Sequence, residues 1–465
     1  MQKFKNWLCL LMSNSKYFYI FFMLLNTFLS CLIFLINSQD IILSISVVIN
    51  LFFSFYLCYK FAPESYYLKL SVVYLLGFSL FIGGRFFANI FGIEDPFCFE
   101  FGYTYCLNYL EKFNTILLIN LSLVSFVYGY LNNEFPKENI EVSVNINVVN
   151  FSKIKFIIIY ILALLSGFYV IYNTFLNVQK AISSGYLALY ESQVEVYSSP
   201  IFLMVTLFFN AIVALLFAYK DYFNKIYYYF VMFLFLMNFF MSVLTGARAG
   251  FFTALIILIW LYVGKKGLSF IKFSAIPLLL TLAFSVNKIA SLSGARVAET
   301  GGNFYQKFVE EILYGQGITM MVFSLGSMRN DYPLLAYIKT IIPGSQVIAS
   351  FFTDIYQYQL SFSQYLMYKI SPGLFYEGYG LGWSLLGDFY AFSFGFIFLF
   401  MIYNYFWGKT LFFISNKVDK NIFYHGLYFC FLTYIFLINR LSISPLLVLV
   451  GFYFLLVLFV KIRWK

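Results

Sequence analysis

Long apolar runs constrain this chain more than any other feature. A membrane-crossing helix needs roughly 20 apolar residues, and the sequence holds about twelve such runs. Because 62% of the residues are hydrophobic and 11% are charged, no water-soluble core could bury so much apolar surface. The runs are continuously apolar rather than alternating, which excludes a β-barrel. We therefore expect an all-α polytopic membrane protein, with spans near 17–36, 41–58, 67–84, 114–131, 154–176, 200–219, 226–244, 250–264, 270–289, 381–406, 422–438 and 445–460.

The spacing of these runs predicts three parts. Residues 1–289 contain nine spans, 290–380 form one large extracytoplasmic loop, and 381–465 contain the last three spans. The first run is long and lacks a small-residue cleavage site, so a cleavable signal peptide is not expected. Loops of this length are usually functional or disordered, and 290–380 is too apolar for disorder. We expect it to form short helices that rest on the membrane surface or cover a cleft.

The lysines predict the orientation. Most of them lie in loops on one side of the expected bundle, together with both chain ends. Lysine and arginine in short loops remain cytoplasmic, so both termini are expected in the cytoplasm. The net charge of +10 is then explained by topology and by attraction to anionic lipid. A nucleic-acid partner is not expected, because the chain has no basic soluble module.

The arginines do not follow the lysines. Five of the six fall on the expected outward side: Arg85, Arg248, Arg296, Arg329 and Arg440. A guanidinium group offers a planar, bidentate fork to phosphate and keeps its charge in a poorly hydrated cleft. The pattern therefore predicts that four or five of these groups converge on an anionic ligand near one membrane surface. The alternative, that an arginine only extends to the interface or pairs with a carboxylate, has equal weight for Arg85 and Arg329.

The cysteines and the single histidine add less. Cys98 and Cys106 share an outward loop, where an oxidising compartment permits a disulfide, but their spacing alone does not settle whether they are bonded. Cys9, Cys31, Cys58 and Cys430 lie in or near apolar runs, where packing is the expected role. The same applies to His425, which is not expected to be catalytic. No P-loop, HExxH or paired CxxC occurs, so neither nucleotide hydrolysis nor structural zinc is expected.

Three local patterns resemble the O-antigen polymerases, the Wzy family of oligosaccharide repeat-unit polymerases. They are the turn Thr245-Gly246-Ala247-Arg248-Ala249-Gly250, the pair Ile342-Pro343, and the glycine-rich segment from Gly378 through Asp388-Phe389-Tyr390 to Gly395. The resemblance covers much of 240–440 and the overall topology. It implies a fold like that of GT-C glycosyltransferases. It also implies a metal-independent transfer at the outer face of the bacterial cytoplasmic (inner) membrane.

In that reaction a growing polysaccharide on undecaprenyl pyrophosphate moves onto the next lipid-linked repeat unit. The implied partners are the lipid-linked oligosaccharide, membrane lipid, a chain-length regulator and a flippase. No cofactor is implied. The sequence leaves open the sugars, the linkage, retention or inversion, the oligomeric state, and whether the product is O-antigen or capsule.

The expected site residues follow from this chemistry. Fixed guanidinium groups stabilise the charge that develops on a departing pyrophosphate, which favours Arg248, Arg296 and Arg440, with Arg329 as a weaker candidate. An acceptor hydroxyl benefits from a general base, and the candidates are Asp388, Glu377 and Glu299. Each could instead pair with an arginine, and for Glu299 we favour that interpretation. Tyr376, Tyr379 and Tyr390 are expected to stack on sugar rings, with ordinary interface anchoring as the alternative.

Two other functions remain open. A ligase that moves finished O-antigen to the lipid A core would share the lipid donor and the presumed fold. A flippase or other transporter for lipid-linked oligosaccharide would usually carry ionisable groups near the bilayer midplane in corresponding halves. Here the charges lie at span ends and one large outward loop comes late, which favours the polymerase.

Overall fold

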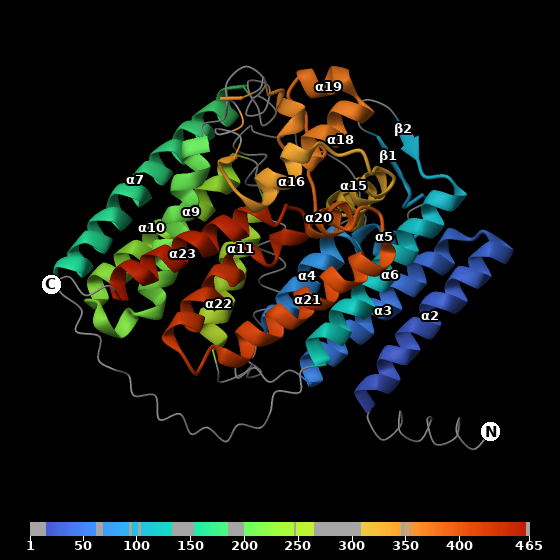
Figure 1. The fold of residues 1–465 in the computed structure, drawn as a ribbon, viewed down its shortest axis with the longest axis horizontal. Helices are drawn as coiled ribbons and strands as arrows, with labels where there is room; N and C mark the ends of the chain where they lie inside the picture. The colour runs from blue at the N-terminus through green and yellow to red at the C-terminus, as the bar shows by residue number, and fades with distance from the viewer. Residues whose placement is uncertain are drawn as a thin grey trace.

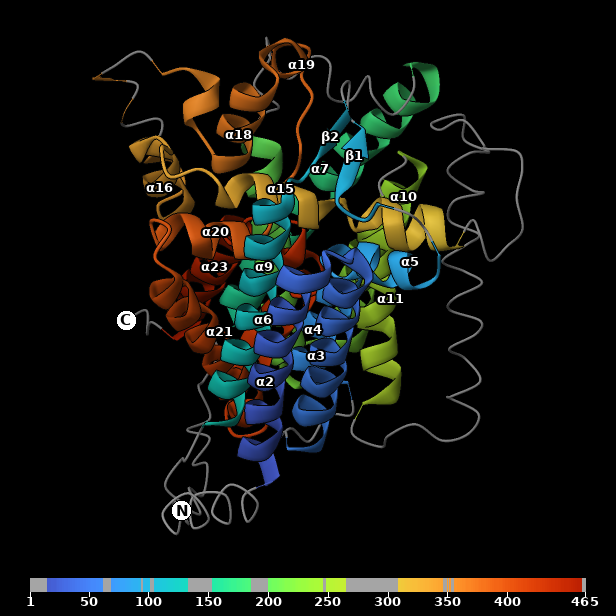
Figure 2. The same cartoon turned by 90° about the vertical axis from the view of Figure 1, so that its right-hand side faces the viewer.

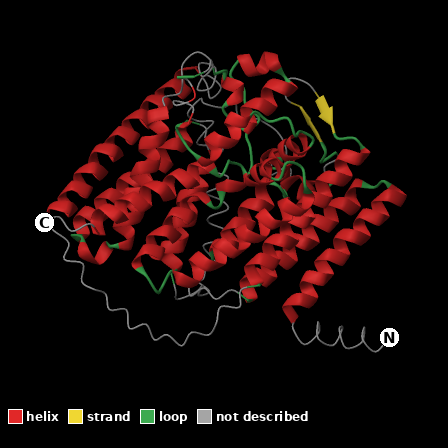
Figure 3. Cartoon of the chain, viewed as in Figure 1, coloured by secondary structure: helices red, strands yellow, loops and turns green. Residues whose placement is uncertain are grey.

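The computed structural model is almost entirely helical (Figure 1). It describes residues 15–61, 68–92, 95–100, 104–132, 153–184, 200–245, 248–264, 308–345, 349, 351–352 and 355–461. The strands are β1 (Cys98–Glu100) and β2 (Thr104–Cys106), an antiparallel hairpin shown in yellow in Figure 3. Short turns of helix are η1 (Lys220–Tyr222), the π-helical η2 (Phe308–Tyr314), η3 (Gln357–Gln359) and η4 (Leu437–Asn439).

Within these residues, eight helices are long and apolar enough to cross a membrane. They are α2 (Ser15–Asn37), α3 (Asp40–Lys60), α6 (Tyr109–Leu131), α7 (Lys153–Ser184), α9 (Pro200–Ala218), α10 (Lys225–Leu244), α21 (Ile397–Lys417) and α23 (Ser444–Lys461). Large apolar side chains remain exposed along them, for example Phe28 on α2 and Leu165 on α7. Such surface is stable in contact with lipid tails, so the expectation of an all-α polytopic membrane protein is confirmed.

The remaining expected spans are bent, short or outside the described residues. Residues 67–84 form α4 (Leu70–Phe81), which meets α5 (Gly84–Ile90) at a bend of 60°. Two further expected spans are shorter than a full span. They are α11 (Arg248–Val263), with 16 residues, and α22 (Ile422–Tyr434), with 13 residues. The expected span 270–289 lies outside the described residues.

The expected span 381–406 is two helices, α20 (Leu385–Phe392) and α21. The break falls at Phe394 and Gly395, which both have positive φ angles, of 51° and 80°. Left-handed backbone ends a right-handed helix, and glycine adopts it at little cost. As a result α20 stands apart from the membrane-crossing stretch that begins at Ile397.

The spans form two groups. In one, α2, α3, α6 and α21 pack together, and in the other α7 packs on α9 and α10 while α9 packs on α23 (Figure 1). The closest crossing joins α6 to α21. A Cβ added to Gly129 would lie 1.9 Å from the Tyr405 carbonyl oxygen, and one added to Gly408 would lie 2.1 Å from the Phe126 carbonyl oxygen. Small residues on both sides therefore allow the two backbones to touch.

Polar side chains inside the first group bond to one another. Asn26 of α2 donates to Asn50 Oδ1 of α3 at 2.9 Å, and Asn50 donates to Asn120 Oδ1 of α6 at 2.9 Å. Asn120 in turn donates to Ser46 Oγ at 3.0 Å. Such bonds satisfy polar groups that lipid cannot, and they hold the three helices in register.

The shorter helices gather at one end of the bundle. They are α15 (Ile318–Ser327), α16 (Leu334–Ile341), α18 (Phe362–Ile370) and α19 (Pro372–Tyr376). Figure 2 shows α16, α18 and α19 on the same end as the β1–β2 hairpin, with α18 and α19 beyond the ends of α2, α3, α6 and α21. The short helices expected in the late loop are therefore present where that loop is described.

Candidate functional site

Arg440 lies where η4 turns into α23. Its side chain is half-buried, and its Nη1 donates to Gln316 Oε1 at 2.5 Å. The guanidinium carbon is 5.9 Å from the ring centroid of Phe81, at the end of α4. Because Gln316 lies between η2 and α15, the bond links the 440–443 turn to the large late loop. Arg440 is therefore contacted by two distant segments, at Gln316 and at Phe81.

Asp388 fixes the same turn from the other side. It is fully buried in α20, and the helix is capped by Ser384, whose hydroxyl accepts from the Gly387 amide at 3.0 Å. Asp388 Oδ1 accepts from Trp383 Nε1 at 2.8 Å, and Oδ2 accepts from the Ile443 amide at 2.6 Å. The Ile443 bond ties α20 to the 440–443 turn, three residues from Arg440.

The environment of Asp388 perturbs its ionisation. Burial raises the pKa of this carboxyl to about 7, although the bonds from Ile443, Ser442 and Trp383 act in the opposite direction. A carboxylate accepts hydrogen bonds on both oxygens, whereas the protonated acid must donate one. The arrangement seen here therefore suits the ionised form, and burial makes that form sensitive to pH near neutrality.

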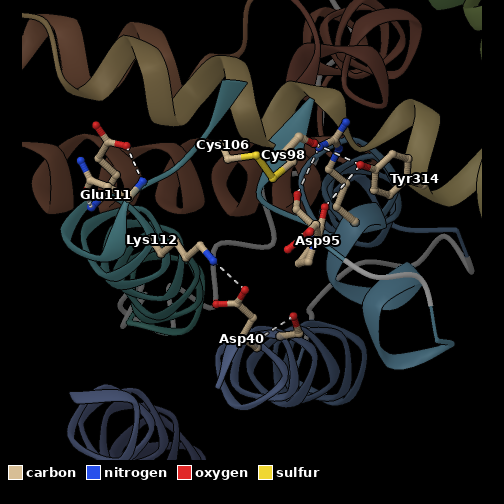
Figure 4. A network of polar contacts seen from close by, with 11 residues as sticks. Asp40, Asp95, Cys98, Cys106, Glu111, Lys112 and Tyr314 are labelled. Atoms are coloured by element: carbon tan, nitrogen blue, oxygen red, sulfur yellow. Dashed lines mark hydrogen bonds and ion pairs between the residues drawn. A yellow bond between two sulfur atoms is a disulfide. The ribbon is translucent and has the colours of Figure 1, made fainter. Parts of the chain in front are cut away.

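Arg85 has a different role. It is 3% exposed and its guanidinium carbon lies 4.1 Å from the ring centroid of Tyr314. Its Nη1 donates to the carbonyl oxygens of Pro96, at 3.2 Å, and Cys98. Tyr314 also donates to the Cys98 carbonyl, at 3.1 Å, as Figure 4 shows. Arg85 thus links the hairpin to η2 through backbone carbonyls and a tyrosine ring, and none of these contacts is to a carboxylate.

The same view shows the state of Cys98 and Cys106. Cys98 and Cys106 are joined by a disulfide and face each other as register partners in the hairpin (Figure 4). At the base of the hairpin, Lys112 pairs with Asp40 at 2.6 Å, and the Glu111 side chain accepts from the Asn108 amide at 2.7 Å. The hairpin is linked to this end of α6 by the Tyr105 hydroxyl, which donates to the Glu111 carboxylate at 3.2 Å.

Two of the expected arginines meet around one short segment. Gly317 packs so closely on α5 that an added Cβ would lie 2.6 Å from the Arg85 amide nitrogen. Its neighbour Gln316 accepts from Arg440. The structure therefore brings Arg85 and Arg440 to the segment Tyr314–Gly317, although 355 positions separate them in the sequence.

Arg329 stands elsewhere. It follows the far end of α15, a helix of 10 residues, and about 15 Å of helix separate it from the Gln316 end. Its neighbour Asp331 accepts from the Tyr365 hydroxyl at 2.6 Å and lies 3.7 Å from Lys369 Nζ. The Tyr365 bond, with help from Lys369 and Arg329, lowers the pKa of Asp331. Arg329 therefore lies with Asp331, Tyr365 and Lys369, which we call the outer cluster, and not at the Arg440 turn.

Other expected residues are placed in part. Arg248 opens α11, but its side chain lies outside the described residues, as do Arg296 and Glu299. Glu377 is exposed at the end of α19. In both Figure 1 and Figure 2, α19 lies well away from α20, so Glu377 is not beside Asp388.

The three expected sugar-binding tyrosines do not form one surface. Tyr376 is 60% exposed on α19, and Tyr379 is half-buried just after it. Tyr390 packs edge-on against Phe400 at 5.8 Å and Phe323 at 6.4 Å. The first two can meet a ligand from water, while Tyr390 serves the packing of α20 on α15 and α21.

Sequence reasoning missed Gln316, Trp383 and Ile443. Gln316 stands between Gly315 and Gly317, and a polar side chain flanked by glycines in an apolar loop is a signal for close backbone approach. Trp383 precedes Asp388 by five residues within the glycine-rich segment, yet only the N-cap geometry of α20 turns its indole toward the carboxylate. The Ile443 amide carries no sequence signal.

These features define a class before they define a family. The eight apolar spans found in the described residues define a multi-pass membrane protein, and its partly buried polar contacts include the bond from Arg440 to Gln316. The profile of the family described as O-antigen polysaccharide polymerase Wzy matches residues 18–465. The chain belongs to this family. Searches of curated proteins and of solved structures return no significant match.

Proposed function

We propose that this protein polymerises lipid-linked oligosaccharide repeat units at the outer face of the bacterial cytoplasmic membrane. The growing O-antigen chain would move from undecaprenyl pyrophosphate to the next lipid-linked unit. Family membership supports a polymerase in general. The observation that carries the finer assignment is Arg440, held by Gln316 on one side and, through its turn, by Asp388 on the other.

The reaction needs little more than charge stabilisation and one proton acceptor. A hydroxyl oxygen of the acceptor sugar attacks the anomeric carbon of the donor chain, and the bond from that carbon to the pyrophosphate oxygen breaks. Undecaprenyl pyrophosphate leaves with the bonding electrons, and the hydroxyl proton passes to a base. Arg440 stabilises the negative charge on the departing oxygen. Arg248 and Arg296 remain proposed contributors from segments whose side chains lie outside the described residues.

The carboxylates take different parts. Both oxygens of Asp388 already accept hydrogen bonds from the protein, which supports a positioning role through the 440–443 turn. Glu377 lies apart on α19, which disfavours it as the base beside Arg440. Glu299 therefore remains the candidate for the proton acceptor, in a segment outside the described residues. Arg329 is proposed to serve the outer cluster rather than the pyrophosphate.

We place this site outside the membrane, with both termini in the cytoplasm. Two independent observations support that orientation. Lysines gather on the opposite side, as expected for cytoplasmic loops. The disulfide hairpin occupies the same end of the bundle as α16, α18 and α19 (Figure 2), and disulfides persist in oxidising compartments. A flippase would deliver the substrate to this face, and a chain-length regulator would act on the product.

The deciding experiment is deletion of the gene, followed by separation of the lipopolysaccharide on a gel. A polymerase deletion should leave core plus one repeat unit, a ligase deletion bare core, and a flippase deletion no repeat unit at all. The deletion strain is then complemented with Arg440→Ala, and its product should remain core plus one repeat unit. Lys409→Ala, an exposed cation in α21, is the control and should restore the full set of bands. Long chains with Arg440→Ala would refute the assigned role.

A further inference from the structure

Four tyrosines form a row on the outer helices. We call Tyr356, Tyr358, Tyr368 and Tyr376 the tyrosine ladder. The rings of Tyr356 and Tyr358 are stacked, with centroids 5.6 Å apart and planes 11° apart. Those of Tyr358 and Tyr368 are stacked at 4.2 Å and 10°. Tyr376 meets Tyr368 edge-on at 6.3 Å.

Packing explains only the centre of the row. The stack of Tyr358 on Tyr368 joins η3 to α18, and both rings are half-buried. The two end rings remain open, because Tyr356 is 59% exposed and Tyr376 is 60% exposed. Exposed aromatic surface of this kind indicates a contact with another molecule when it is contiguous.

Lipid is not that molecule. In Figure 2, α18 and α19 stand beyond the ends of α2, α3, α6 and α21, on the far side of α16. The span α7 reaches a similar height because its 32 residues, about 48 Å of helix, exceed the roughly 30 Å of a hydrocarbon core. An aromatic residue that anchors a protein in the membrane interface belongs at the level where the spans end. The ladder therefore faces water, where its exposed rings are not stabilised by headgroups or hydrocarbon.

We infer that the tyrosine ladder binds the glycan part of the substrate, an inference that rests on the proposed function. The flat C–H face of a pyranose ring stacks on an aromatic face, and hydroxyl groups beside it meet phenol oxygens. Because the central rings cover one another, the sugars would stack on the exposed end rings of Tyr356 and Tyr376. Two such rings on either side of a stacked pair suit a chain of repeated sugars better than a compact apolar anchor. The ladder is distinct from the Arg440 turn, because α19 lies well away from α20 in both views.

The consequence concerns product length. A polysaccharide held by the ladder stays near the reacting end, which raises its effective concentration for the next transfer. Removing the exposed rings should shorten the products without preventing the first coupling, since the Arg440 turn remains intact.

The test compares two double variants in the deletion strain. Tyr356→Ala with Tyr376→Ala removes the end rings, whereas Tyr356→Phe with Tyr376→Phe retains them. We expect the alanine pair to at least halve the most abundant chain length while still joining two units, and the phenylalanine pair to match wild type. The control is Phe351→Ala with Phe352→Ala, which removes two rings that are 79% and 81% exposed outside the ladder. Wild-type chain lengths with the alanine pair would overturn the inference.

Binding is then measured on the full chain in lipid nanodiscs. The probe is lipid-free polysaccharide, released by mild acid from the wild-type lipopolysaccharide. Loss of two stacking rings should weaken its binding about tenfold. Shortened products with unchanged binding would overturn the glycan assignment and indicate a protein occupant such as a length regulator. If the deletion strain itself does not stop at one unit, the proposed function fails. If it does stop but the alanine pair behaves as wild type, only the ladder fails.

Discussion

Replacing Asp388 by asparagine tests whether this buried carboxylate positions Arg440. Asp388 accepts on both oxygens from two fixed donors, the Trp383 indole and the Ile443 amide. Asparagine has one accepting oxygen, so in either orientation its NH2 group faces one of these donors. A buried donor without a partner costs about 1–3 kcal/mol. If displacement of Arg440 raises the activation free energy of transfer by the same amount, the transfer rate falls roughly 5- to 150-fold.

The pH dependence has a defined sign. Burial raises the pKa of Asp388 from its ordinary value near 3.8 to about 7. Activity that needs the ionised form should therefore fall as pH drops through about 7. Stability should change in the opposite direction, because a raised carboxyl pKa means that the folded state binds its proton more tightly. This contribution to the free energy of unfolding is present at low pH and is lost as pH rises toward 7. Loss of activity without loss of folding is thus expected on mild acidification.

The assay is single-turnover transfer between lipid-linked units in nanodiscs, measured from pH 5.5 to 8.5. Asp221→Asn, the same change at an exposed carboxylate in η1, is the matched control and should leave the rate and its pH profile unchanged. Arg440→Lys supplies the second arm. If Asp388 acts through Arg440, the two losses should be less than additive. If the losses of rate in the two single variants add fully in the double variant, Asp388 contributes to the reaction independently of Arg440. A wild-type rate and pH profile for a well-folded Asp388→Asn protein would refute the reasoning altogether.

Two further predictions concern the scaffold. Gly129→Ala should destabilise the α6–α21 crossing by about 1–3 kcal/mol or more, because the new methyl group would overlap the Tyr405 carbonyl. Its melting temperature in detergent should fall, whereas Gly451→Ala, with no atom within 4 Å of the added Cβ, should melt as wild type; equal melting of both would contradict the close packing. Cys98→Ser should cost about 2–3 kcal/mol, as loss of a short disulfide loop predicts. Reductant should bring wild type to the melting temperature of this variant and leave the variant unchanged; a wild-type response that differs from the variant would place the stabilising effect elsewhere.

Local composition was sufficient to predict the membrane architecture. The eight long spans in the described residues follow from continuous apolar runs, because a water-soluble fold could not bury that much apolar side-chain surface. The glycine-rich segment and the Arg248 turn were sufficient to suggest the family that the profile identifies over residues 18–465. The sequence singled out Arg440 as a candidate pyrophosphate ligand, which stays a prediction; the structure shows that its side chain bonds to Gln316.

Hydropathy could not locate the break between α20 and α21. The run from Leu381 to Phe406 is almost wholly apolar, and only the left-handed backbone at Phe394 and Gly395 divides it. Nor could residue type separate Arg85 from Arg440. Both were expected to face outward, yet Arg85 is stacked on Tyr314 beside the hairpin, while Arg440 bonds to Gln316.

The partner of each polar group was decided by tertiary packing. Asp388 meets an amide 55 residues later in the chain, and Arg440 meets Gln316 across 124 residues. The hydropathy of a segment is the sum of the contributions of its residues, so a membrane-crossing helix can be predicted from the sequence of that helix alone. A hydrogen bond depends on direction and on a few tenths of an ångström, and both are set only when distant helices have packed.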